Sequence, residues 1–276
     1  MTYLRTAHRF TIARACAGVG LSRAAWYRPR IDWAQRDAPV VDGLNAALAK
    51  NGRWGFGLCF DWLRNRGDRW NHKRVHRVYC ELRLNLPRRH KRRLPPIVRQ
   101  PLVAPTAQNQ MWALDFMQDA LYSGRAFRTL NVIDESNRQA LAIEIDTSLP
   151  SGRVIRVMEQ LGELRGLPRA IRVDNGPELR AQAFVDWCGQ HSIAMCFIQP
   201  GEPQQNAFVE RFNRTYRHEV LNAYVFDTLE QVRLISEGWV QLYNEERPHR
   251  ALGRLPPARF AERRTTLENS SYPAST

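Results

Sequence analysis

Between residues 110 and 200 the hydrophobic period of the sequence changes, and this order of patterns restricts the fold more than any other feature. Three stretches with the alternation and residue types of β-strands come first. They cover 111–116, 127–133 and 139–145. Turn residues separate them, with Gly124 after the first and polar residues 135–137 after the second. We therefore expect an antiparallel meander.

Helical and strand patterns then alternate along the chain. Val154, Val157 and Leu161, for example, recur at the spacing of one helix face. The predicted elements are strands at 170–173 and 194–198 and helices at 154–164, 184–190, 206–221 and 229–243. Three strands followed by this alternation predict an α/β fold, in which one mixed sheet is flanked by helices.

Charge is distributed unevenly along the 276 residues, which carry a net charge of +14. Residues 1–110 contain 22 Lys and Arg against 6 Asp and Glu, a net of +16, whereas residues 111–276 contain 19 against 21, a net of −2. Such an excess indicates a polyanionic partner, nucleic acid before an acidic membrane. We expect a basic, DNA-contacting N-terminal part and a near-neutral catalytic or structural remainder.

The N-terminal part contains the pattern of a helix-turn-helix twice. The first copy is weak: residues 11–17 are compatible with a helix, and Ser22 is a predicted N-cap for a second short one. The second copy is better formed, with helices predicted at 56–66 and 71–82. We therefore predict a small all-α, helix-turn-helix-like DNA-binding region over residues 1–86.

The helix predicted at 71–82 has an apolar and a basic side. Its apolar residues recur at helical spacing and should face a core: Val75, Val78, Tyr79 and Leu82. Its basic residues remain for the other faces and include Lys73, Arg74 and Arg77. A helix that enters a major groove needs such a face for phosphates and base edges. A charged face that contacts only solvent is the alternative.

Proline and positive charge indicate a linker at 87–109, which contains the basic run Arg88–Arg93. Because proline removes backbone donors and disfavours helix, we predict an extended segment that follows a DNA backbone by charge alone. Residues 110–262 then form the predicted core domain. Residues 263–276 are predicted to be a disordered tail because of their Asn, Ser and Pro content.

The five cysteines include no Cys-x-x-Cys pair, so free thiols are expected, as in a cytoplasmic, nucleoid-associated protein. His72 and His76 lie near two of them, Cys59 and Cys80. The paired cysteine spacing of structural zinc sites is missing, and helix histidines that face solvent or DNA are favoured instead. The sequence contains no apolar stretch of membrane-spanning length and no secretory signal.

Three acidic residues occupy positions in predicted secondary structure where an acidic side chain calls for a structural or functional explanation. Asp115 lies inside an otherwise apolar predicted strand, and Asp174 directly follows another. Strand ends are where α/β sheets commonly expose functional groups. Glu210 lies on a predicted helix, with Asn206 one turn before it on the same face. Taken singly, Asp174 is explained by an Asx turn and Glu210 by an exposed pair with Arg214.

Taken together, the three acids lie in motifs that resemble the DDE integrase core. The motifs are Trp112-x-x-Asp115, the VDNGPE run from Val173 to Glu178, and the PQQNAFVERFN run from Pro203 to Asn213. Thirty-five residues separate Asp174 from Glu210. More narrowly, the chain resembles the second-reading-frame (OrfB-type) transposases of two-frame bacterial insertion sequences. The resemblance extends back to the WNHKRV run at 70–75 and on to the YN-x-x-RPH run at 243–249.

This resemblance implies an RNase H-like fold with a five-stranded mixed sheet. It also implies that Asp115, Asp174 and Glu210 are the catalytic residues and hold two Mg²⁺ or Mn²⁺ ions. The chemistry agrees, because phosphodiester transfer needs an activated oxygen nucleophile and a stabilised leaving oxyanion. Hard divalent cations supply both and prefer carboxylate oxygens. Water would cut the end of the element, and the freed 3′-hydroxyl would attack a second phosphodiester.

The resemblance further implies that Asn206 and Arg217 contact DNA beside the metals, and that Arg211 and Arg214 extend the positive face of their helix. Asn175 and Gly176 would shape the turn that presents Asp174. The implied partners are the DNA of the element's ends and of the target, a first-reading-frame (OrfA-type) protein or a fusion with it, and further copies of the chain assembled on DNA.

Two other functions compete with a metal-dependent transposase. The first is a catalytically silent DNA-binding regulator or inhibitor of transposition that uses the basic N-terminal part. The presence of all three acids argues against it, because a decayed core would be expected to lose at least one. The second is a nuclease of the RNase H type that cuts RNA in hybrids, which the basic helical region and the linker disfavour.

Overall fold

The structure is a computed structural model that describes residues 2–29, 32–87, 102, 104–199 and 203–270. The chain divides into two compact units, Met1–Asp42 and Gly43–Thr276. Most of the linker predicted at 87–109 lies outside the described residues.

The first unit contains three short helices, α1 (Thr2–Thr6), α2 (Ile12–Gly18) and α3 (Arg23–Tyr27). Thr11 caps α2, and Ser22 caps α3 by accepting a hydrogen bond from the backbone N–H of Ala25. The two helices predicted here are therefore confirmed, with Ser22 in the predicted role.

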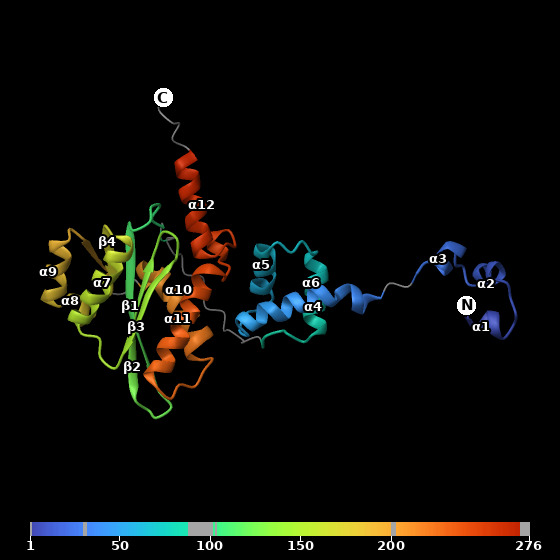
Figure 1. The fold of residues 1–276 in the computed structure, drawn as a ribbon, viewed down its shortest axis with the longest axis horizontal. Helices are drawn as coiled ribbons and strands as arrows, with labels where there is room; N and C mark the ends of the chain where they lie inside the picture. Colours follow the sequence, from blue (N-terminus) through green and yellow to red (C-terminus); the bar gives the residue numbers. More distant parts are fainter. Residues whose placement is uncertain (1, 30–31, 88–101, 103, 200–202, 271–276) are drawn as a thin grey trace. The chain divides into compact units, whose positions relative to one another are not determined.

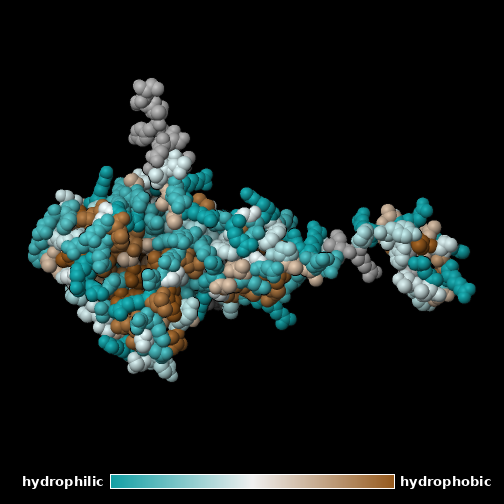
Figure 2. All heavy atoms as spheres, in the orientation of Figure 1, coloured by the Kyte–Doolittle hydropathy of each residue, from teal (hydrophilic) through white to brown (hydrophobic). Residues whose placement is uncertain are grey.

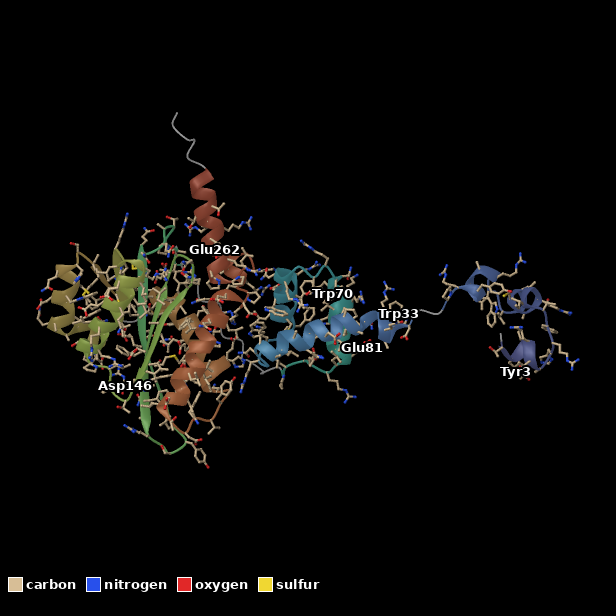
Figure 3. All side chains as sticks on the ribbon, in the orientation of Figure 1. Tyr3, Trp33, Trp70, Glu81, Asp146 and Glu262 are labelled. Atoms are coloured by element: carbon tan, nitrogen blue, oxygen red, sulfur yellow. The ribbon has the colours of Figure 1, made fainter. Side chains whose placement is uncertain are left out.

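An eighteen-residue helix, α4 (Trp33–Lys50), begins in this unit and was not predicted. Pro39 lies inside it and removes a backbone donor from its interior, so the sequence pattern favoured a break. Asp32 accepts a hydrogen bond from the backbone N–H of Gln35 at the start of the helix. Close to its C-terminal end, Gly43 lies so near the Trp70 ring that an added Cβ would be 2.9 Å from it (Figure 3).

The next two helices are α5 (Phe56–Arg66) and α6 (His72–Glu81), and they confirm the second predicted helix pair. Gly67 ends α5 in the left-handed conformation, at φ 105°, which glycine adopts without strain. Asn71 caps α6, and its side chain accepts a hydrogen bond from the backbone N–H of Lys73. Leu82 was predicted to face the core, but it is 38% exposed, because it forms the C-cap where α6 ends.

A five-stranded sheet forms the centre of the second unit, with the order β3-β2-β1-β4-β5 (Figure 1). The strands are β1 (Met111–Ala120), β2 (Ala126–Asp134), β3 (Ala140–Asp146), β4 (Ala170–Val173) and β5 (Ala194–Phe197). The pairs β1–β2 and β2–β3 are antiparallel, which confirms the meander, whereas β4 pairs in parallel with both β1 and β5.

Helices cover both faces of the sheet, and each face has its own hydrophobic core (Figure 1). One face packs against α7 (Ser151–Arg165) and α9 (Gln182–Gln190), with α8 (Pro177–Arg180) between β4 and α9. The other face packs against α10 (Ala207–Tyr216) and α11 (Leu229–Glu245). The predicted α/β class and flanked sheet are confirmed, while α8 was not predicted.

The helix predicted over 206–221 consists of three different segments. A 3₁₀ turn, η1 (Pro203–Asn206), leads into α10, and a π-helical segment, η2 (Arg217–Leu221), follows it. Such π-helical turns are rare and occur frequently near functional sites. They leave no periodic signal in the sequence.

After α11 the chain forms the 3₁₀ turn η3 (Arg250–Leu252) and the helix α12 (Pro257–Ser270). The tail predicted to be disordered from Arg263 onward is therefore wrong as far as Ser270. The run AERRTTLE contains mostly good helix formers and continues the helix. Residues 271–276 lie outside the described part of the chain.

Polar contacts join α5 to the end of the core within the second unit. Glu246 accepts hydrogen bonds from Lys50 at 2.8 Å and from the indole of Trp62 at 3.1 Å. Arg254 donates to Asp61 at 2.8 Å. The segment after α11 thus contacts α5 and the end of α4 through polar and charged side chains.

The visible surface of the core mixes hydrophilic side chains with apolar patches (Figure 2). Tyr224, Val225 and Leu234 are among the large apolar side chains that are exposed in the described residues, at 51%, 75% and 70%. No helix in the described residues is both long and apolar enough to cross a membrane.

Candidate active site

The sheet brings the first two acids side by side. Strand β4 pairs in parallel with β1 so that Ala113 lies opposite Arg172. Continued by two residues, this register puts Asp174, directly after β4, beside Asp115 on the central strand. Two residues that are 59 positions apart in the sequence thus lie next to each other at the carboxyl end of β4.

The electrostatics of Asp115 place the third acid near the first two. Burial of Asp115 is the main cause that raises its pKa, to about 6, and the charges of Asp174 and Glu210 raise it further. A hydrogen bond from the backbone N–H of Phe116 and one from Asn213 act in the opposite direction. Asp174 and Glu210 therefore both act on Asp115 within one region of the core.

Asn213 holds Asp115 directly. It lies on α10, one turn after Glu210, and its Nδ2 donates a hydrogen bond to Oδ2 of Asp115 at 2.7 Å. Its own Oδ1 accepts one from Nδ2 of Asn131 on β2, also at 2.7 Å. Both amides are buried. The helix that carries Glu210 is thereby fixed to the strand that carries Asp115.

Asp174 forms the Asx turn that its sequence allows. Its Oδ1 accepts a hydrogen bond from the backbone N–H of Gly176 at 2.9 Å. Asn175 donates from Nδ2 to the carbonyl of Ile198, which joins the turn to the end of β5. The turn therefore fixes one oxygen of Asp174. The same residue lies beside Asp115, so its role in an Asx turn is compatible with a role in the acidic cluster.

Asn206 directly precedes α10 and lies one turn before Glu210. It is only 3% exposed, and its Oδ1 is buried without a hydrogen-bond partner in the described structure. The predicted DNA contact of Asn206 would thus require it to become accessible, because it lies at the buried junction of η1 and α10.

The three acids are neighbours but not a ready set of metal ligands. In the described ranges, no group of three Asp, Glu, His or Cys side chains is arranged to hold a metal ion. The chemistry of the donors nevertheless fits a hard divalent cation. Asp115 experiences two further negative charges, and no positive charge is among the causes that shift its pKa. Asn206 adds an unpartnered amide oxygen next to this region.

The basic residues predicted on this helix differ in their environment. Arg211 and Arg214 are exposed on α10. Arg217, in η2, is half-buried and donates hydrogen bonds to Asp119 at 3.0 Å and to the carbonyl of Gln118 at 2.8 Å. Arg217 therefore pairs with the end of β1, which its sequence spacing from Glu210 did not indicate.

The predicted basic face of α6 also lies where solvent reaches it. Lys73 and Arg77 are exposed and Arg74 is half-buried. Arg77 forms an ion pair at 2.8 Å with Glu81, the last residue of the helix (Figure 3). His72 and His76 lie edge-on to the ring of Phe56, so the histidines pack against α5.

Residues of the motif at 243–249 join separate elements of the fold. Asn244 pairs with both backbone groups of Ala140 on β3. Arg247 donates to the buried carboxylate of Glu219, at 2.8 Å for its closest contact. Burial lowers the pKa of His249 to about 3, so it remains neutral. These residues stabilise the fold around α11.

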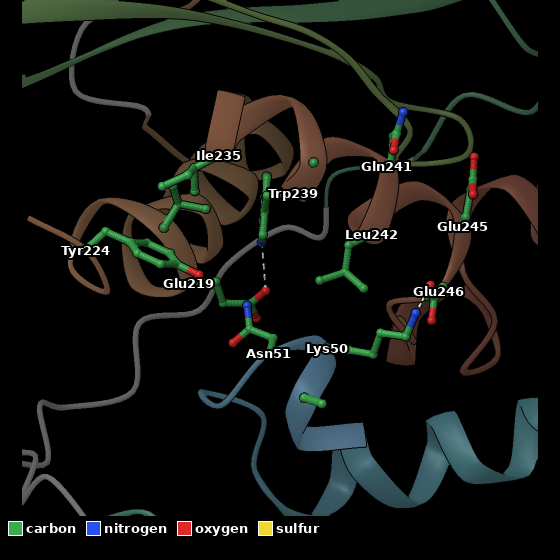
Figure 4. A pocket seen from close by; sticks show the side chains of 13 residues that line it. Lys50, Asn51, Glu219, Tyr224, Ile235, Trp239, Gln241, Leu242, Glu245 and Glu246 are labelled. Atoms are coloured by element: carbon green, nitrogen blue, oxygen red, sulfur yellow. Dashed lines mark hydrogen bonds and ion pairs between the residues drawn. The ribbon is translucent and has the colours of Figure 1, made fainter. Parts of the chain in front are cut away.

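A groove of about 440 Å³ lies elsewhere, between the end of α4 and α11 (Figure 4). Its lining includes Tyr224, Trp239 and Leu242, with Glu219 accepting a hydrogen bond from Trp239. None of the three candidate acids lines this groove. The acidic cluster thus lies outside this groove.

Comparison with known protein families agrees with this geometry. The integrase core domain family matches residues 105–203, and a second integrase core domain family matches residues 191–257. The two matches together include Asp115, Asp174 and Glu210. They also cover all five strands and the helices α7, α9, α10 and α11 that pack on the two faces of the sheet.

Curated relatives give a narrower result. An uncharacterized 39.2 kDa protein of insertion element IS476 from Xanthomonas euvesicatoria is 38% identical over 94% of this chain and 75% of its own length. A 31.7 kDa protein of insertion element IS407 from Burkholderia multivorans is 36% identical over 95% and 94%. The transposase of IS629 from Shigella sonnei is 23% identical over 54% and 51%.

The fold is similar to that of a solved viral assembly. A chain of the simian T-cell lymphotropic virus intasome, solved in complex with the PP2A regulatory subunit B56 gamma, matches with a TM-score of 0.50 and 16% identity. The match covers 78% of this chain and 71% of that one. It confirms the integrase-like, RNase H-type fold.

The fold and the family matches define an integrase-core protein of the polynucleotidyl transferase superfamily. Within this class, the chain belongs to the insertion-sequence transposases of the second-reading-frame (OrfB) type, whose role is DNA transposition. The resemblance inferred from the motifs is confirmed. The roles of the individual site residues are a separate question.

Proposed function

We propose that this chain cleaves and joins DNA strands by a DDE mechanism, with Asp115, Asp174 and Glu210 holding two Mg²⁺ or Mn²⁺ ions. The observation that carries the proposal is that the β1–β4 register continues to Asp174 beside Asp115, and that Asn213 ties the helix of Glu210 to Asp115. Burial and the charges of the other two acids raise the pKa of Asp115 to about 6. Acids gathered without a cation repel one another, and a pair of divalent ions would relieve that repulsion.

When bound, the ions would activate the attacking water or 3′-hydroxyl and stabilise the leaving oxyanion. The protein's own groups prepare the site for them. Asn213 orients Asp115 through Oδ2, and the N–H of Gly176 orients Asp174 through Oδ1. Oδ1 of Asp115 also accepts a hydrogen bond from the backbone N–H of Phe116, so both carboxylates are held in defined directions toward a ligand.

Basic residues outside the acidic cluster would hold the DNA. The exposed guanidinium groups of Arg211 and Arg214 follow Glu210 along α10 and can each grip a phosphate in a bidentate manner. Lys73, Arg74 and Arg77 on α6 would contact DNA at a second position, in the manner of a helix-turn-helix. We propose the element's ends and target DNA as substrates, with assembly of several copies and a first-reading-frame partner on that DNA.

The test is Mg²⁺-dependent nicking of a supercoiled plasmid that carries the element's ends. Asp174→Asn should abolish nicking and leave duplex binding intact, because it removes a ligand charge but no DNA contact. Asp186→Asn is the matched control, since Asp186 is exposed on α9 and pairs only locally, with Gln182. Nicking by Asp174→Asn at the wild-type rate would refute the DDE mechanism.

A further inference from the structure

Two buried amides connect the inside of the sheet to Asp115. Asn131 lies on β2 directly opposite Asp115 in the β1–β2 register and is 0% exposed. Its Nδ2 donates to Oδ1 of Asn213, and Asn213 donates in turn to Oδ2 of Asp115, each at 2.7 Å. The three side chains thus form one hydrogen-bonded series across β2, α10 and β1.

The direction of this series is determined by Asp115. An ionised carboxylate only accepts hydrogen bonds, so Asn213 must turn its NH₂ group toward it. The carbonyl oxygen of Asn213 then faces Asn131, which must donate a hydrogen bond to it from its own NH₂ group. The two ends of an amide have nearly the same shape, so packing alone does not select this orientation. Asp115 at the NH₂ end of the Asn213 amide and the donor of Asn131 at its oxygen select this orientation together.

Packing gives no reason for an amide at position 131. The neighbours of Asn131 on this face of β2 include Phe127 and Ile133, which belong to the hydrophobic core against α10 and α11. The Oδ1 atom of Asn131 is buried without a partner in the described structure. An apolar side chain would avoid this unpaired acceptor, and the one compensating contact of the side chain is its hydrogen bond to Asn213.

We propose that Asn131 is a positioning residue for the metal site: by locking the amide orientation of Asn213, it fixes the direction of Asp115. This inference rests on the proposed function. Asn131 touches neither substrate nor metal and acts only through Asn213. The proposal predicts that loss of the Asn131 donor weakens metal binding while the fold is retained.

The first experiment compares full-length Asn131→Leu with the wild type by calorimetric titration with Mn²⁺. Without the Asn131 donor, Oδ1 of Asn213 is left buried and unpaired and the amide is held at one end only, so the direction of Asp115 is less well fixed and Mn²⁺ affinity should fall about tenfold. Thr129→Val is the matched control, because Thr129 is also 0% exposed on this face of β2 and its Oγ1 has no partner in the described structure. This control should bind Mn²⁺ like the wild type.

A second measurement reports the lock itself without metal. In the full-length protein, the side-chain NH₂ signals of Asn213 are identified by NMR through their loss in Asn213→Ala. They should exchange slowly with solvent in the wild type and in Thr129→Val, and faster in Asn131→Leu. If Asn131→Leu does not fold, Asn131→Thr replaces it, since the shorter side chain cannot reach Asn213.

The outcomes are distinct. Unchanged Mn²⁺ affinity and unchanged protection of the Asn213 amide in the Asn131 variants would overturn the proposal. An equal loss in Thr129→Val would also overturn it, because the effect would then be one of packing. Protection of Asn213 that depends on Asn131, in a wild-type chain that binds no Mn²⁺, would support the lock and refute the proposed metal mechanism.

Discussion

Asp115 shows how burial and charge act on a single residue of this site. In the free chain an aspartate ionises near pH 4, and in the fold its pKa is about 6, mainly because of burial and next because of Asp174. The folded protein therefore holds a proton on Asp115 more tightly than the unfolded chain. Ionised Asp115 costs stability, and a bound cation would offset that cost.

This shift predicts a pH dependence of stability with a defined sign. Because the folded pKa is raised, the contribution of Asp115 is most favourable below about pH 4 and is lost as the pH rises through 6. Asp115→Asn should therefore be more stable than the wild type at pH 8 by about 3 kcal/mol. The difference should vanish below pH 4, as measured by urea unfolding without metal. An equal difference at both pH values would contradict the assignment.

Activity should follow the same group in the opposite direction. A cation needs the ionised carboxylate, so nicking and Mn²⁺ binding should both rise as the pH increases through about 6. Calorimetric titration between pH 5 and 8 measures the binding without DNA. Affinity that is constant over this range would show that Asp115 is not a ligand.

The limits of the sequence are clearest at this scale. Asp115 could be predicted because an acid stands inside an apolar strand, and Asp174 because it follows one. Asn213 and Asn131 could not, since their value lies in hydrogen bonds to residues 98 and 82 positions away in the chain. The resemblance implied a DNA contact for Arg217, and the sequence did not indicate that the fold also pairs this residue with Asp119.

Among the elements, the π-helical segment η2 depends on one buried carboxylate. Glu219 is 3% exposed and accepts hydrogen bonds from Trp239 at 3.1 Å and from Arg247. The segment directly follows the helix that carries Glu210. We infer that this ion pair holds the end of that helix against α11, because a buried charge is tolerated only where it is paired.

Removing one partner should therefore be costly. Arg247→Ala leaves the buried charge of Glu219 unpaired and should lower the free energy of unfolding by about 3 kcal/mol. Arg77→Ala, which removes the exposed pair with Glu81, should cost about 0.5 kcal/mol. Chemical denaturation at pH 7 compares the two. Equal losses would mean that Glu219 is solvated in solution.

The helix α10 allows its basic residues to be separated by experiment. Arg214 is exposed and available to a phosphate, whereas Arg217 is engaged by Asp119. Arg214→Ala should weaken duplex binding several-fold and Arg217→Ala should weaken it less. Fluorescence anisotropy with a labelled duplex measures both. A larger effect of Arg217→Ala would show that DNA displaces Asp119 from that arginine.

Strands were easier to predict than long helices in this chain. The β4 bounds were predicted without error, since Gly and Pro residues and a change of period mark short buried strands. The helix α4 was missed because Pro39 lies inside it, and the tail was taken as disordered although α12 extends to Ser270. In both cases local composition contradicted an element that the rest of the chain supports.

For the whole molecule, the excess positive charge and the three candidate acids lie in different parts of the sequence. The net charge of +16 lies in residues 1–110, while the remainder, with all three acids, carries −2. A cluster of acids would by itself repel a DNA backbone. Attraction over a distance must therefore come from the N-terminal part, and the acids meet a phosphate only after that attraction has brought it near.

This division predicts a steep and local salt dependence of DNA binding by the full chain. Affinity for a duplex should fall at least tenfold between roughly 50 and 200 mM salt, because bound phosphates release counterions.

The double variant Lys73→Gln/Arg77→Gln should flatten the logarithmic salt slope by about 2, since each substitution leaves one phosphate without its cation. Arg153→Gln is the control, since Arg153 pairs with Glu144 in the core and should leave the slope unchanged. An identical slope for all three proteins would place the DNA-binding surface away from α6, and an affinity insensitive to salt would remove the basic N-terminal part from DNA binding altogether.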